Sequence, residues 1–88
     1  MRDSPQLTSE ARVAAVVLRL LTQRSITRRV GPSEDLREAG LTSMDMLNLV
    51  LAIEAEFDLE IPESHISPAN FRCIDAISSL VGTLLPRQ

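Results

Sequence analysis

Two adjacent hydroxyl residues, Thr42 and Ser43, are the most obvious candidates for chemistry in this 88-residue chain. They follow Gly40 and stand directly before an apolar run, a position typical of a loop that leads into a helix. One interpretation is structural: Ser and Thr are favoured N-caps, and Thr42 with Asp45 three residues later resembles a capping box. The other is chemical, because a phosphate ester at this point would meet the free N–H groups and positive dipole end of the helix.

Few other side chains could do chemistry. A single Cys and a single His, Cys73 and His65, exclude a disulfide framework and leave too few ligands for a cysteine- or histidine-based metal site. We expect Cys73 to be a small buried side chain and His65 a polar loop residue. Glu54 and Glu56 are typical of a solvated helix face, and no candidate base lies near Ser43 in the sequence. We therefore expect no catalytic residues, no bound metal and no enzymatic activity.

The composition favours helices as the elements that position these residues. Aromatic residues make up only 2% of the chain, as Phe57 and Phe71, whereas Leu, Ala, Ile and Val are abundant. A length of 88 residues leaves room for one hydrophobic core. The sequence therefore predicts a single all-α domain over residues 1–88.

The order of these helices follows from the spacing of apolar residues. Helical periodicity extends over about Thr8 to Gln23, over Ser43 to Phe57, and from Ile74 to near Pro86. Pro62 to Asn70 has room for one or two helical turns. Ser25 to Leu41 has no sustained period, so we expect a long loop held down by its apolar residues Leu36 and Leu41. The predicted architecture is a small four-helix bundle, with three principal helices, one short helix and a long loop between helices one and two.

Charge is distributed unevenly along the chain, although the net charge is only −3. Residues 1–33 carry six Arg and two carboxylates, whereas residues 34–63 carry nine carboxylates and one Arg, a local charge of −8. An acidic surface repels nucleic acid and attracts basic protein surfaces. We therefore expect basic protein partners and no nucleic acid.

No segment predicts membrane insertion. The longest apolar run, Val13 to Leu18, is far shorter than the roughly 20 residues that span a bilayer. The N-terminus shows no secretion signal. A cytoplasmic monomer is the expectation.

The predicted helix over Ser43 to Phe57 has two apolar faces. At 100° per residue one face collects Met46, Leu49, Val50, Ile53 and Phe57. A second apolar stripe, nearly opposite, collects Met44, Leu47, Leu51 and Ala55. Either the long loop folds over this second apolar stripe, or the stripe is exposed, rimmed by carboxylates, and docks in the groove of a partner. We favour docking.

The stretch from Asp35 to Pro62, DLREAGLTSMDMLNLVLAIEAEFDLEIP, resembles the acyl carrier proteins and their peptidyl and aminoacyl relatives. That family has a loop with Gly-Leu, an Asp-Ser-Leu motif, an apolar and acidic helix that ends in Glu-x-x-Phe, and an Ile-Pro exit. The motif serine of the family carries 4′-phosphopantetheine as a phosphodiester, and it matches Ser43. The following leucine, which the attaching synthase recognises, matches Met44. The partner-facing apolar positions match Leu47 and Leu51.

The resemblance implies a non-catalytic carrier. The covalent 4′-phosphopantetheine arm would hold an acyl or aminoacyl group as a thioester and present it to successive enzymes of lipid, fatty-acid or secondary-metabolite biosynthesis. The implied partners are a phosphopantetheinyl transferase, an acyl- or aminoacyl-loading ligase, and downstream transferases or synthases. We expect partner recognition to use Met44, Asp45, Leu47, Leu51, Glu54 and Glu56.

The sequence departs from the family pattern at two positions. The Asp that usually precedes the serine is Thr42, and an acidic position five residues after the serine is Asn48. The loss of these charges predicts specialised partners instead of the standard enzymes of fatty-acid synthesis. The segment after Pro62, with Asn70 and Phe71, resembles free-standing carriers of dedicated pathways, including aminoacyl carriers. The alternative function is a helical adaptor that docks partners through the same helix without a prosthetic group.

Overall fold

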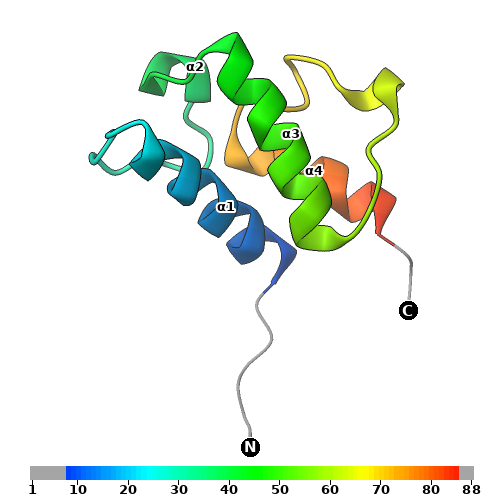
Figure 1. The fold of residues 1–88 in the computed structure, drawn as a ribbon. Helices are drawn as coiled ribbons and strands as arrows, with labels where there is room; N and C mark the ends of the chain where they lie inside the picture. The colour runs from blue at the N-terminus through cyan, green and yellow to red at the C-terminus, as the bar shows by residue number, and fades with distance from the viewer. Residues whose placement is uncertain (1–7, 86–88) are drawn as a thin grey trace, which may run out of the picture.

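The computed structural model describes residues 8–85, and within them all regular structure is helical. Three long helices, α1, α3 and α4, are joined by connections that contain a short helix, α2, and a single 3₁₀ turn, η1 (Figure 1). Their bounds are α1 Ser9–Gln23, α2 Leu36–Ala39, α3 Ser43–Phe57, η1 Glu63–His65 and α4 Ile74–Leu84. The predicted all-α bundle with three principal helices is confirmed.

Helix α1 begins and ends at local signals that the sequence contains. The hydroxyl of Thr8 accepts a hydrogen bond from the N–H of Ala11 at 3.0 Å, which satisfies one of the free donors of the first turn. At the other end Ser25 adopts a left-handed conformation with φ 62°, and the next N–H, of Ile26, bonds back to the carbonyl of Leu21 at 2.8 Å. The predicted range, about Thr8 to Gln23, is therefore confirmed.

The connection between α1 and α3 is more ordered than the sequence analysis expected. Leu36 and Leu41 are both buried, as predicted. Leu36 also begins the four-residue helix α2, which the sequence analysis did not predict. The carboxylate of Asp35 accepts hydrogen bonds from two N–H groups at the start of α2, and Gly40, with φ 126°, ends it. These cap residues are the sequence signal that could have revealed α2.

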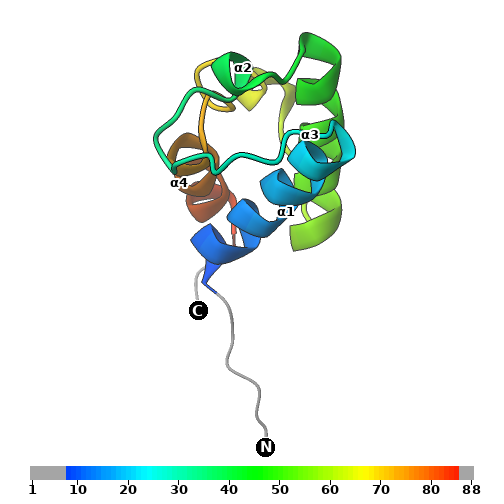
Figure 2. The same cartoon turned by 90° about the vertical axis from the view of Figure 1, so that its left-hand side faces the viewer.

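One aliphatic core lies between the three long helices. Helix α1 packs against both α3 and α4, and Figure 2 shows α1 in front with α3 and α4 on either side. The connections contribute Leu36, Leu41, Ile61 and Phe71 to the same core. The long helices contribute Val13, Val16, Val17, Leu20, Leu21, Leu49, Val50, Ile53, Phe57, Ile74, Ile77, Leu80 and Val81. Both aromatic side chains of the chain are thus buried.

The segment between α3 and α4 contains one helical turn, within the one or two turns predicted for Pro62 to Asn70. Only η1, Glu63–His65, is helical, and the stretch that follows Ser67 forms a turn. The Ser67 hydroxyl accepts a hydrogen bond from the N–H of Asn70 at 3.3 Å, so Ser67 caps that turn. Cys73 precedes α4 and is buried, as expected.

None of the helices within residues 8–85 is both long enough and apolar enough to cross a membrane. The same residues contain no group of three or more potential metal ligands.

Candidate functional site

Thr42, and not Ser43, takes the capping role that the sequence left open between them. Thr42 is the N-cap of α3: its hydroxyl accepts from the N–H of Asp45 at 3.2 Å, and the Asp45 carboxylate accepts from the N–H of Thr42 at 2.8 Å. This reciprocal pair is a capping box. Ser43 is the first residue of α3, and its side chain is exposed. Capping therefore does not occupy the Ser43 hydroxyl.

The first turn of α3 contains backbone N–H donors that are available to bind an anion beside Ser43. Within residues 8–85 the N–H groups of Ser43 and Met44 bond to no protein acceptor. These donors and the helix dipole favour a negative group on the Ser43 oxygen. The local geometry therefore suits a phosphodiester at this position.

Asp45 is enclosed at the same junction, with only 6% of its side chain exposed. Its Oδ2 atom accepts hydrogen bonds from the N–H and the hydroxyl of Thr42 and lies 3.1 Å from Nε of Arg24, the residue that ends α1. The hydrogen bond from the Thr42 N–H, together with the Thr42 hydroxyl and the charge of Arg24, outweighs desolvation and holds the pKa of Asp45 below its usual range. This network ties the end of α1 to the start of α3 and fixes the turn that displays Ser43.

The second apolar stripe of α3 is exposed. Met44 is 67% exposed, Leu47 is 53% and Leu51 is 63%, and Ala55 is exposed as well. On the opposite face of the helix, four side chains are buried in the core: Leu49, Val50, Ile53 and Phe57. The alternative interpretation, in which the long loop covers the stripe, is therefore wrong.

The carboxylates expected to rim this stripe bond within the chain. Glu54 accepts a hydrogen bond from the N–H of Ile61 at 2.8 Å, which holds the segment that leaves α3. Glu56 lies 2.9 Å from Arg12 and 3.9 Å from Arg19, and both arginines come from α1. The structure thus places Asp45, Glu54 and Glu56 in internal contacts, in contrast to the apolar residues of the stripe.

A groove of about 450 Å³ opens beside Ser43. One wall is α3, and the facing walls are α2 and the segment from Ile66 to Arg72. The α3 wall is formed by Ser43, Met46, Leu47 and Val50, and the facing side chains include Asp35, Arg37, Ile66, Pro68, Phe71 and Arg72. Sequence analysis did not find this groove, because its walls come from segments far apart in the chain.

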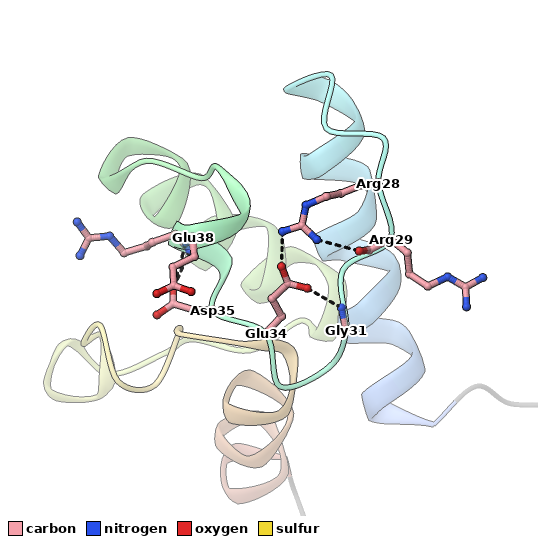
Figure 3. Close-up of polar contacts among 7 residues, drawn as sticks. Arg28, Arg29, Gly31, Glu34, Asp35 and Glu38 are labelled. Carbon is pink, nitrogen blue, oxygen red and sulfur yellow. Dashed lines mark hydrogen bonds and ion pairs between the residues drawn. The ribbon is translucent and has the colours of Figure 1, made fainter.

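An ionic contact shapes the loop that leads into α2 (Figure 3). Arg28 pairs with the carboxylate of Glu34, and the other oxygen of Glu34 accepts from the N–H of Gly31 at 3.2 Å. Arg28 also donates to the carbonyl of Arg29 at 3.1 Å. The hydrogen bond from Arg28, followed by that from Gly31, lowers the pKa of Glu34. The contact holds the loop in front of Asp35, which caps α2.

The chain matches a known protein family over most of its length. Residues 11–81 match the profile described as a phosphopantetheine attachment site, a range that includes Ser43 and all of α3. The chain is 43% identical over 74 residues to aminoacyl carrier protein 1 of Bradyrhizobium diazoefficiens, covering 84% of this chain and 82% of that protein. It is also 43% identical over 70 residues to aminoacyl carrier protein 2 of the same organism, covering 80% and 79%.

Solved structures show the same fold in similar chains. One belongs to a crystal structure of Bradyrhizobium japonicum glycine:carrier protein ligase complexed with glycylated carrier protein, with a TM-score of 0.74 and 39% identity over 82% of this chain and 96% of that one. Another belongs to a complex of the ligase with its cognate carrier protein and an analogue of glycyl adenylate, with a TM-score of 0.77 and 40% identity over 85% and 96%.

These matches confirm the family indicated by the stretch from Asp35 to Pro62. The family's defining feature is a serine to which 4′-phosphopantetheine is covalently attached. With the family profile extending from within α1 to within α4, the chain belongs to the phosphopantetheine-dependent acyl and aminoacyl carrier proteins.

Proposed function

We propose that Ser43 is the serine that carries the 4′-phosphopantetheine arm. The observation that supports this most directly is the division of roles at the start of α3, where Thr42 provides the cap and Ser43 is left exposed. The N–H groups of the first turn and the dipole of a 15-residue helix favour the negative phosphodiester. The chain's own part is to hold the hydroxyl outward, and the attaching transferase would supply the chemistry.

The cargo that we propose is an aminoacyl group, held as a thioester on the thiol of the arm. Support comes from the relatives, which are named aminoacyl carrier proteins, and from the similar chains in complexes with a glycine ligase. By the same reasoning an amino acid ligase is the proposed loading partner. Fatty-acid or other lipid biosynthesis, which the sequence analysis kept open, has no such support from these relatives.

The docking surface that we propose is the second apolar stripe of α3. Met44, Leu47 and Leu51 are large, exposed apolar side chains on one side of a helix whose other side is in the core. A partner groove that covers them would gain the free energy of removing this apolar area from water. The transferase, the ligase and any later acceptor enzyme would meet the chain at this face, beside Ser43.

Two measurements test this proposal in sequence. Co-expression with a phosphopantetheinyl transferase should increase the intact mass by one arm, and peptide mapping should place it on Ser43. The holo protein is then incubated with the Bradyrhizobium japonicum glycine ligase, ATP and glycine, and the intact mass should rise by one glycyl group that hydroxylamine removes. A chain that stays unmodified would favour the adaptor, and loading with fatty acids but no amino acid would overturn the aminoacyl assignment.

A further inference from the structure

Two arginines and one carboxylate, Asp35, line the groove beside Ser43. Arg37 of α2 and Arg72 of the segment before α4 both line it, and both side chains are exposed. Within residues 8–85 neither forms an ion pair. Their charges are therefore presented to whatever covers this end of α3.

The backbone holds these two arginines on the same side of the groove. The N–H of Leu36, next to Arg37, donates to the carbonyl of Arg72 at 2.8 Å. A second hydrogen bond, from the N–H of Asp75 to the carbonyl of Pro32 at 2.9 Å, ties the same two segments together. Two residues that are far apart in sequence thus lie on segments joined by backbone hydrogen bonds, and both line the groove that Ser43 lines.

The carboxylate that lines this groove is bonded within the chain, whereas Glu38, next to Arg37 in α2, is exposed but does not line the groove. Asp35, which also lines the groove, accepts from the N–H groups of Arg37 and Glu38 through Oδ1. Asp45 is enclosed by Thr42 and Arg24. The exposed carboxylates near α3 instead follow its other end, at Asp58, Glu60 and Glu63. The groove at the Ser43 end therefore carries two exposed arginines against one hydrogen-bonded carboxylate, whereas exposed carboxylates follow the far end of α3.

We infer that the loading enzyme presents carboxylates at the entrance to its active site, where they meet Arg37 and Arg72 while its apolar surface covers the second apolar stripe. This inference rests on the proposed function, because it assumes that Ser43 is delivered to that enzyme. Charge complementarity argues for an acidic partner surface, since like charges brought together at an interface are strongly unfavourable. At the Ser43 end the partner surface that we infer is acidic, whereas the acidic sequence of residues 34–63 predicted a basic one.

The test uses holo protein, its modification at Ser43 verified by mass, and the Bradyrhizobium japonicum glycine ligase. Arg37→Glu and Arg72→Glu should each raise the KM for the carrier at least about fivefold at low salt, with kcat little changed, because a repulsive contact weakens the encounter. Raising the ionic strength should reduce the difference from wild type, because salt screens exposed charges. Arg37→Gln and Arg72→Gln should give smaller increases in the same direction.

The matched control is Arg29→Glu, which makes the same change of charge at an exposed side chain of the loop before α2, away from the groove (Figure 3). Its KM should stay within about twofold of wild type. Equal KM values for all three Glu variants, or a lower KM for Arg37→Glu and Arg72→Glu, would overturn the inference while leaving carrier function intact.

A comparison of apo and holo forms excludes a second explanation. In that explanation, Arg37 and Arg72 bind the phosphodiester of the chain's own arm and do not contact the ligase. Binding of the apo protein to the ligase, measured by calorimetry, should also weaken in Arg37→Glu and Arg72→Glu. Weakening confined to the holo form would overturn the docking inference in favour of that internal contact. Failure of the wild-type holo protein to be loaded at all would instead count against the proposed function.

Discussion

At the scale of single residues, neighbouring hydroxyls in the same motif have different physical roles. Thr42 satisfies donors at the start of α3 through the capping box with Asp45, whereas Ser43 is exposed. A cap must have its side chain turned back onto the helix, and an attachment site must have its oxygen directed away from it. One residue cannot do both at once. Thr42 therefore contributes to stability, and Ser43 is left free for the attachment that we propose.

This separation predicts opposite effects of two alanine variants. Ser43→Ala should abolish attachment of the arm and change the free energy of unfolding by less than about 0.5 kcal/mol, because no cap is lost. Thr42→Ala should retain attachment but lower the free energy of unfolding by about 0.5 to 2 kcal/mol. Intact mass after treatment with transferase and urea unfolding measure the two effects. Modified Ser43→Ala protein, or attachment at Thr42, would contradict the assignment of Ser43.

At the scale of elements, α3 is a helix with two apolar faces in different environments. Ile53, at the centre of one face, is fully buried, and Leu51, on the second apolar stripe, is 63% exposed. Burial of an apolar side chain stabilises the fold, whereas exposure of a contiguous apolar patch is typical of a surface used for binding. The same residue types on one helix thus contribute to folding on one side and, in the function that we propose, to docking on the other.

The two faces should respond differently to substitution. Leu51→Asp should leave the helical circular dichroism and the midpoint of unfolding nearly unchanged, but should slow arm attachment and loading by raising KM, because a charge replaces an apolar contact. Ile53→Ala should lower the free energy of unfolding by about 2 to 5 kcal/mol, because it leaves a cavity in the core. Thermal melts and transferase kinetics separate the outcomes. An unfolded Leu51→Asp protein would show that the stripe belongs to the core.

At the scale of the whole molecule, charged contacts join α1 to α3 at both ends. Near the end of α3, Arg12 binds Glu56 and lies over the ring of Phe57 at 4.3 Å. Near the start of α3, Arg24 binds Asp45. The arginine-rich first third of the chain and the acidic middle segment therefore neutralise each other in part. The charge of −8 over residues 34–63 is displayed to partners less fully than the sequence suggests.

The contact at Asp45 predicts a specific dependence of stability on pH. Its pKa in the folded protein is depressed, so its carboxylate stabilises the fold above the unfolded pKa of about 3.9, and this contribution is lost as the pH falls through the folded value. Asp45→Asn should therefore be less stable than wild type at pH 7, and the difference should shrink as the pH falls below about 4. Urea unfolding across this range measures it.

A control for this prediction is available at the other end of α3. Asp58 is exposed and left-handed with φ 51°, a conformation that Asn tolerates, so Asp58→Asn makes the same change of side chain and should differ little from wild type in stability at pH 7. A stability difference between wild type and Asp45→Asn that stays constant from neutral to acid pH would contradict the proposed role of the ionised carboxylate.

Local signals in the sequence predict the three long helices and most of the core. The limits of α3 at Ser43 and Phe57, the buried face of that helix and the burial of Leu36 and Leu41 were all predicted, because caps and apolar periodicity are local properties. The short helix α2 was missed although Asp35 and Gly40 flank it, since four residues are too few to show a period.

The charges that remain available at the surface depend on how distant segments pack together. The sequence predicts an acidic rim formed by Asp45, Glu54 and Glu56. In the structure each of these side chains bonds to a group from another part of the chain. Arg37 and Arg72 are unremarkable in the sequence and lie on the same groove as Ser43. Helical periodicity fixes the direction of a side chain relative to its own helix, but the partner that the side chain meets depends on how distant segments pack together.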